Sequence, residues 1–95
     1  TCLTAQNPKG VYGIQACSPE IVRRQIQAVL DELPPAAVKT GMLYSAPIIL
    51  VVAESLRRRR PLPVVVDPVM VSTSGAQLLQ TDAVKALRAK LFSGR

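Results

Sequence analysis

The sequence predicts an α/β fold with a mostly parallel sheet, and three observations lead to that prediction. Amphipathic helical patterns alternate with short apolar runs along the chain. The run Val64–Val66 is continuous and β-branched, as in strands covered on both faces. Asp67 follows this run at once, and open α/β sheets bind their ligands at the carboxyl ends of strands. Asp67 is therefore the first candidate for chemistry.

Length and composition fit a single domain, residues 1–95, with a modest core. The 95 residues are 48% hydrophobic and 19% charged, which is typical of a globular chain rather than a disordered one. The chain starts at Thr1 without an initiator Met and stops at Arg95 directly after a helical pattern. We therefore expect it to be an internal piece of an incomplete domain.

The formal charge of +6 permits nucleic acid, anionic membranes or phosphorylated small molecules as partners. Two tyrosines, one phenylalanine and no tryptophan are too few for base stacking, so we expect no nucleic-acid partner. The run Arg57–Arg60 is typical of a solvated helix end. The apolar stretch 47–53 is shorter than the roughly 20 residues that span a bilayer, so we expect no membrane partner.

Cysteine and histidine content limits the chemistry. Cys2 and Cys17 have neither CxxC nor metal-ligand spacing, and no segment resembles a signal peptide, so free, buried thiols in the cytoplasm are expected. The sequence has no His, which excludes Ser-His-Asp and Cys-His catalysis and imidazole metal sites from this segment. Its chemistry must use carboxylates, hydroxyls, backbone amides or a bound ion.

The first part of the chain predicts two strands and a helix. Residues 2–5 are predicted as the tail of a strand, with a polar turn at 6–10 and a short edge or flap strand at 11–15. Ser18 before Pro19 is a helix N-terminus signal, and the helix is expected to end at Pro34. Its predicted buried face consists of Val22, Ile26, Val29 and Leu33.

The second part predicts a βαβ unit with a right-handed crossover. Residues 37–42 read as a strand running into a turn, and Ser45 is the expected cap of the next helix. This helix should end in the arginine run before the strand at 64–66. Its predicted buried residues are Ile48, Val52 and Leu56. A loop at 71–76 and a third helix at 81–92, buried through Val84, Leu87 and Leu91, complete the pattern.

In a parallel sheet the carboxyl ends of the strands share one edge. We therefore expect the loops that carry Gln6, Gly41–Met42 and Asp67–Met70 to converge, which would suit a small polar heterocycle beside a charged reacting group. Each residue also has a structural interpretation, because an amide can satisfy turn backbone, a glycine can serve a turn geometry and a methionine can fill the core. The hydroxyls and amides of Ser72–Gly75 suit phosphate, although no Walker pattern is present.

These residues resemble a known family. The segments 4–7, 38–43 and 66–71, with Ser74-Gly75 and the helix from Asp82, are similar in order and spacing to hydroxymethylpyrimidine/phosphomethylpyrimidine kinases of thiamine biosynthesis. The resemblance covers essentially the whole chain. It implies a partial three-layer αβα ribokinase-like fold and ATP-dependent phosphorylation of 4-amino-5-hydroxymethyl-2-methylpyrimidine and its monophosphate.

The resemblance also implies roles for single residues. Gln6 would read the edge of the pyrimidine, and Met42 and Val69 would line the ring pocket. Gly41 completes the predicted substrate-binding residues, because a glycine lets a ligand approach the backbone. Asp67 would lie near Mg²⁺ and the phosphates of ATP. The nucleotide site would also include Ser74 and Gly75. The parent protein is expected to be a cytoplasmic homodimer.

The chain departs from the family pattern at three places. Ala76 stands where relatives usually carry an acid, which puts the contact of that acid with metal or phosphate in doubt. The glycine-rich substrate segment is expected before Thr1, and the anion hole with its catalytic Asp is expected beyond Arg95. We therefore expect the parent to be a kinase and the isolated 95 residues to be inactive.

Two other interpretations stay open. Pyridoxal kinases share the fold and the Asp-Pro-Val turn, although the stretch Thr4–Asn7 favours the pyrimidine kinase. A non-catalytic basic α/β module that binds anions or a protein is the alternative from another class. It gives no reason for Gln6, Met42 and Asp67 to meet at one edge.

Overall fold

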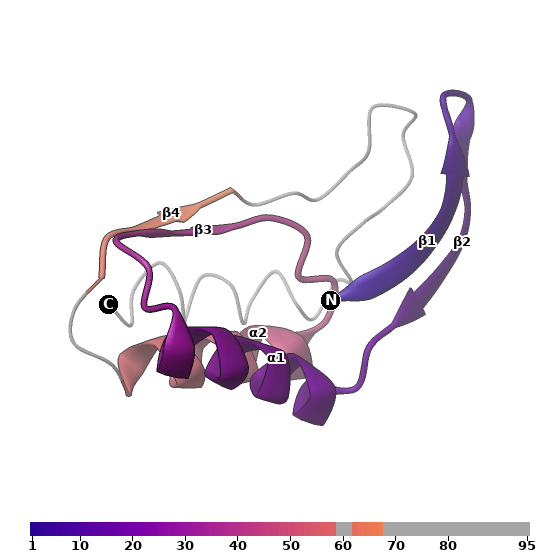
Figure 1. Ribbon diagram of the computed structural model, residues 1–95. Helices are drawn as coiled ribbons and strands as arrows, with labels where there is room; N and C mark the ends of the chain where they lie inside the picture. Colours follow the sequence, from indigo (N-terminus) through magenta and orange to yellow (C-terminus); the bar gives the residue numbers. More distant parts are fainter. Residues whose placement is uncertain (59–61, 68–95) are drawn as a thin grey trace.

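The computed structural model describes residues 1–58 and 62–67, in which a small parallel sheet lies over two helices and a hairpin stands beyond one end of the sheet (Figure 1). The elements in chain order are β1 (Cys2–Asn7), β2 (Gly10–Ala16), α1 (Pro19–Glu32), β3 (Val38–Thr40), α2 (Ala46–Arg57) and β4 (Val64–Val66). This alternation confirms the α/β prediction. The loop expected at 71–76 and the helix expected at 81–92 lie outside the described residues.

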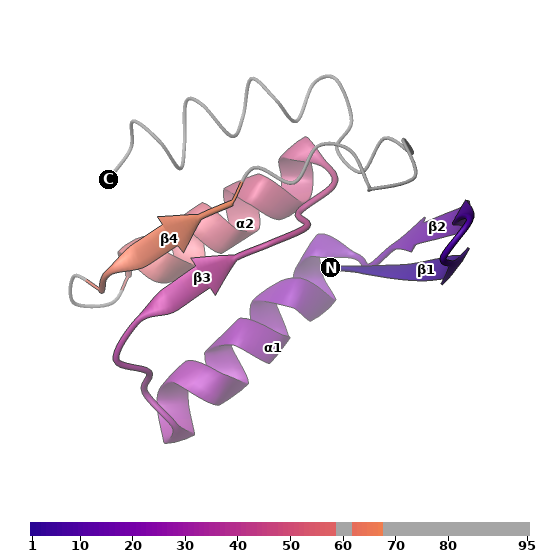
Figure 2. The same cartoon turned by 90° about the horizontal axis from the view of Figure 1, so that it is seen from above.

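The strands β3 and β4 form the predicted βαβ unit with α2 as the crossover. They pair in parallel, with Val38 opposite Val64 and Thr40 opposite Val66. Seen from above, α1 and α2 lie side by side under the two strands and run against the strand direction (Figure 2). The described helices thus cover one face of the sheet. Val65 on β4 is 64% exposed, so the prediction that this strand is covered on both faces is wrong for the described residues.

Local signals set the bounds of α1. The Oγ of Ser18 accepts the amide of Ile21 at 3.3 Å, Pro19 takes the first turn, and the helix ends at Glu32 just before the two prolines. The predicted buried face is only partly right, because Leu30 is buried whereas Val29 and Leu33 are 52% and 73% exposed. The apolar stripe of α1 is wider than the surface that packs against the core. Val22 belongs to the core cluster of α2 residues and Ile26 packs against it.

The core is built mainly from α2. Ile48 is 1% exposed and Ile49 is fully buried. The predicted face of α2 is confirmed and is broader than expected, with buried residues Ile48, Ile49, Val51, Val52, Ala53 and Leu56. Arg57 ends the helix, and Arg58 caps it while forming an exposed ion pair with Glu54 at 3.7 Å. These two arginines are thus at a solvated helix end, as predicted.

The first two strands differ from the prediction. β1 does not join the parallel sheet but pairs antiparallel with β2, from Cys2 opposite Ala16 to Asn7 opposite Gly10. The physical reason is the two-residue connection at Pro8-Lys9, because it lets consecutive strands pair with each other. Cys2 and Cys17 are free thiols, as expected, and both are half-buried. Among the described residues, no helix is long and apolar enough to cross a membrane.

Candidate active site

The candidate site is the rim formed by the carboxyl ends of β3 and β4. Here the amide of Asp67 donates to the carbonyl oxygen of Thr40 at 3.3 Å, and Gly41 follows Thr40 directly. Two loops that are 26 positions apart in sequence, counting from Gly41 to Asp67, therefore lie side by side. The predicted convergence is confirmed for this pair.

Asp67 presents its carboxylate to solvent at this rim. Within residues 1–58 and 62–67, no group of three or more acidic or cysteine side chains could hold a metal ion, so Asp67 offers a single carboxylate. Mg²⁺ commonly keeps several waters and takes one or two carboxylates together with substrate phosphates. One exposed carboxylate at a strand end therefore fits a magnesium–phosphate complex and does not form a closed protein cage.

Gly41 is not explained by backbone geometry or crowding in the described residues. Its φ lies outside the left-handed region, and a Cβ added there would meet only Lys39 Nζ, at an ordinary 3.7 Å. The structural alternative, a turn closed to other residues, is therefore not supported. The positive φ of this loop occurs at Tyr44 instead, at 67°.

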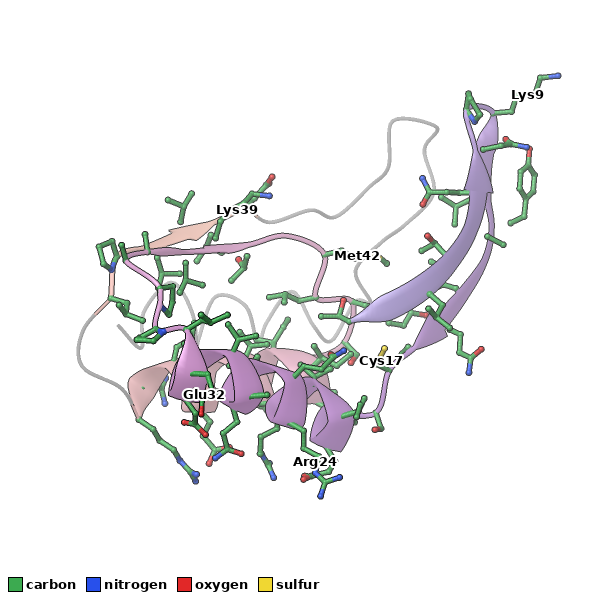
Figure 3. The ribbon with its side chains drawn as sticks, viewed as in Figure 1. Lys9, Cys17, Arg24, Glu32, Lys39 and Met42 are labelled. Atoms are coloured by element: carbon green, nitrogen blue, oxygen red, sulfur yellow. The ribbon has the colours of Figure 1, made fainter. Side chains whose placement is uncertain are left out.

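Lys39 is a rim residue that the sequence reasoning missed. It stands on the side of β3 away from the helices (Figure 3), and its ammonium group reaches the neighbourhood of Gly41. Thr40, the next residue, is only 5% exposed. The alternation of side chains along a strand is the signal that could have identified Lys39, because it places Lys39 opposite to buried Thr40. The rim thus combines a carboxylate with a nearby cation.

Met42 connects the rim to the hairpin. Its carbonyl oxygen accepts a hydrogen bond of 2.6 Å from Thr1 Oγ1, and the carbonyl of Thr1 in turn accepts the amide of Cys17 at 2.7 Å. The hairpin base is therefore fixed beside Met42 at the end of β3. The half-buried side chain of Met42 lies at the same place (Figure 3).

Gln6 lies on β1, and the prediction that it follows a strand of the parallel sheet is wrong. It is five residues from Thr1, which is roughly 17 Å along an extended strand. A register shift separates Ala5 from Gln6, a feature that re-aims side chains and recurs next to active sites. The Gln6 side chain is exposed, and within the described residues it makes no hydrogen bond.

Asn7 takes the structural role that the sequence allowed for an amide at this turn. Its Oδ1 accepts the amide of Lys9 at 2.9 Å and so closes the turn between β1 and β2. Among the described residues the neighbouring Gln6 amide has no partner and is available to a ligand. Val69, Ser74 and Gly75 lie outside the described residues, and their roles stay predictions.

Comparison with known proteins gives a consistent result. The family described as phosphomethylpyrimidine kinase matches residues 1–94. The thiamine biosynthesis bifunctional protein ThiED of Geobacter sulfurreducens is 48% identical over 92 residues, which are 97% of this chain and 19% of that protein. The hydroxymethylpyrimidine/phosphomethylpyrimidine kinase of Synechococcus elongatus is 48% identical over 94 residues, covering 97% of this chain and 35% of that kinase.

A solved structure agrees with the sequence matches. The crystal structure of phosphomethylpyrimidine kinase from Clostridium difficile 630 matches with a TM-score of 0.85 and 45% identity, over 96% of this chain and 39% of that chain. The chain therefore spans about a third of the length of the single-function kinases that it matches. Its fold is part of a ribokinase-like domain, as the resemblance implied.

Proposed function

Because this chain belongs to the phosphomethylpyrimidine kinase family, we propose that the complete protein transfers the γ-phosphoryl group of ATP to 4-amino-5-hydroxymethyl-2-methylpyrimidine and then to its monophosphate. The observation that carries this proposal is the juxtaposition of Gly41 and Asp67 at the rim of the parallel sheet. Ligands bind at this edge of open α/β sheets. In the reaction the substrate hydroxyl oxygen bonds to the γ-phosphorus, the bond from that phosphorus to the β–γ bridging oxygen breaks, and ADP leaves.

The proposed role of each residue follows from its position at the site. The exposed Asp67 carboxylate would hold Mg²⁺ or its waters, and Gly41 lets a ligand approach the backbone. Met42 lines the ring pocket, and the amide of Gln6, which has no partner in residues 1–58 and 62–67, reads the polar edge of the pyrimidine. When bound, Mg²⁺ neutralises phosphoryl oxygens during transfer. The base that takes the hydroxyl proton is proposed to lie beyond Arg95.

Lys39 adds to the proposal. Its ammonium group lies near Gly41 and provides a positive charge at the edge of the rim. A cation in this position favours a phosphorylated ligand over a neutral one. This agrees with a second phosphorylation step in which the substrate already carries a phosphate.

The sharpest test is Asp67→Asn in the complete protein. The substitution keeps size and removes the charge, so kcat should fall about 100-fold or more, which corresponds to about 2.7 kcal/mol of barrier. Glu32→Gln on α1 is the matched control, because Glu32 is also an exposed carboxylate but lies on the helix layer, away from Met42 at the rim (Figure 3). Turnover by Asp67→Asn within twofold of the unmodified protein would assign Asp67 a structural role.

The choice of substrate needs a separate measurement. The complete protein should phosphorylate the pyrimidine alcohol with a kcat/KM at least tenfold above that for pyridoxal, because the site hydrogen-bonds the pyrimidine edge. A clear preference for pyridoxal would replace the pyrimidine assignment with a vitamin B6 kinase. No phosphorylation of either alcohol would favour the non-catalytic anion-binding module.

A further inference from the structure

The parallel sheet turns a charged side chain to the face that points away from the helices. On the helix side, Val38, Val64 and Val66 pack against the core. Side chains alternate along a strand, so Lys39 and Val65 project from the other face, where Val65 is 64% exposed. Lys39 is exposed as well and stands away from the helices (Figure 3). Within the described residues its ammonium group is therefore open to a ligand above the sheet.

The strand register brings Lys39 and Asp67 to this same face. The pairing of β3 with β4 holds to the last residue of each strand, and the amide of Asp67 still donates to the carbonyl of Thr40. The register thus continues by one residue and sets Asp67 opposite Gly41. Lys39 Nζ lies 3.7 Å from the position that a Cβ on Gly41 would take. The ammonium group therefore extends along β3 toward the rim and reaches the residue opposite Asp67.

The charge of Lys39 is not neutralised within residues 1–58 and 62–67. On the helices, Arg23, Arg24 and Arg58 each pair with a glutamate of their own helix. The described residues give the Lys39 ammonium group neither an ion pair nor a hydrogen bond. A lysine ammonium group is a compact positive charge with three donors, which suits phosphate oxygens.

The two strands place opposite charges on the two sides of the rim. Asp67 follows β4 and is the proposed magnesium residue, whereas Lys39 lies on β3, which leads into Met42 of the proposed ring pocket. A phosphate bound on the β3 side therefore belongs to the pyrimidine and not to ATP. We propose that Lys39 is a specificity-determining residue whose ammonium group binds the phosphate of the pyrimidine monophosphate. This inference rests on the proposed function and names the residue that separates its two substrates.

The two phosphorylation steps differ in the charge of the attacking group. In the first step it is a neutral alcohol. In the second step an oxygen of the monophosphate bonds to the γ-phosphorus, the bond from that phosphorus to the β–γ bridging oxygen breaks, and ADP leaves. A phosphate monoester carries a charge of about −1.5 to −2 at pH 7, so it repels the phosphates of ATP. Lys39 reduces this repulsion, so it should matter in the second step alone.

Ligand binding to the complete protein without ATP tests the proposal. Lys39→Gln should weaken binding of the monophosphate about tenfold or more, because a hydrogen bond between charged groups is lost, and should change binding of the alcohol by less than twofold. Lys39→Arg keeps the charge and should restore most of the affinity. Lys9→Gln, at an exposed lysine of the hairpin turn, controls for the lower net charge (Figure 3). An equal loss for both ligands, or no loss for the monophosphate, would overturn the proposal.

Turnover separates this inference from the proposed function. If the unmodified protein phosphorylates both substrates, Lys39→Gln should lower kcat/KM for the monophosphate about tenfold or more and leave that for the alcohol nearly unchanged. Equal losses would refute the role of Lys39 while the kinase activity stands. No turnover of either substrate by the unmodified protein would refute the proposed function, and the binding measurement would then decide the role of Lys39 alone.

A salt titration of the unmodified protein covers the case in which a Lys39 variant does not fold. Raising the ionic strength from about 0.05 M to about 0.5 M screens the attraction between the ammonium group and phosphate. The affinity for the monophosphate should therefore fall relative to that for the alcohol. A ratio of the two affinities that does not change with salt would overturn the proposal.

Discussion

The βαβ unit of β3, α2 and β4 and the β1–β2 hairpin hold their candidate residues in different ways. Ile49 in α2 is fully buried, whereas Leu3 and Tyr12 on the hairpin are 66% and 67% exposed. Gly41 and Asp67 are therefore positioned by a packed core. Gln6 is positioned by a turn, a register shift and the hydrogen bonds of Thr1. Substitutions in the core of the βαβ unit should therefore change mainly the stability, and substitutions on the hairpin should change mainly substrate recognition.

The largest expected effect is on the core side of the comparison. Ile49→Ala in the complete protein should lower the free energy of unfolding by about 2–5 kcal/mol, because it leaves a cavity around a fully buried site. Leu3→Ala is the control and should cost less than about 0.5 kcal/mol, as surface substitutions do. Urea unfolding measures both. Equal losses would show that the hairpin belongs to the main core and would break the comparison.

A smaller effect is expected on the hairpin. Gln6→Ala should raise KM for the pyrimidine about tenfold, or roughly 1.4 kcal/mol, through the loss of hydrogen bonds to the ring. Unfolding should be nearly unchanged, because the side chain is exposed and has no partner in the described structure. Gln15→Ala, an exposed amide on β2, is the matched control. If both variants shift KM alike, the hairpin acts through its overall structure and not through Gln6.

The smallest expected effect concerns backbone strain in the loop between β3 and α2. Tyr44 connects β3 to α2 with a φ of 67°, and the amide of Ser45 donates to the carbonyl of Leu43 at 2.8 Å across it. Glycine adopts this conformation without the strain that other residues incur, so Tyr44→Gly should be about 1 kcal/mol more stable than Tyr44→Ala. Thermal unfolding of the pair measures the strain apart from the loss of the ring. If Tyr44→Ala were more stable than Tyr44→Gly, the backbone at residue 44 would not be strained.

Much of α1 and of the βαβ unit could be predicted because their signals are local. Ser18-Pro19 and Pro34 set the ends of α1, and the β-branched run at 64–66 set β4. The hairpin could not be predicted in the same way. The Pro8-Lys9 connection is not among the strongest hairpin dipeptides, and a strand at 2–5 fits either a parallel or an antiparallel partner equally well.

The candidate site shows the same division. Asp67 and Gly41 could be found because strand ends are visible in sequence and parallel strands end at one edge. The different roles of Gln6 and Asn7 could not be predicted, because two adjacent amide side chains have the same chemistry. Only the structure shows that the backbone amide of Lys9 donates to Asn7. The position of the Lys39 ammonium near Gly41 could not be predicted either, because it depends on the side-chain conformation of Lys39.

The sequence alone determined the order of helices and strands as far as β4, the rim pair of Gly41 and Asp67, and the family. These depend on residues close together in the chain or on motifs in fixed order. Only the tertiary structure decided that β1 pairs with β2, that Leu30 is buried whereas Val29 is exposed, and that Gln6 stands on a hairpin fixed at Met42. These features depend on which distant surfaces meet. An apolar residue specifies that it can be buried but not which partner buries it.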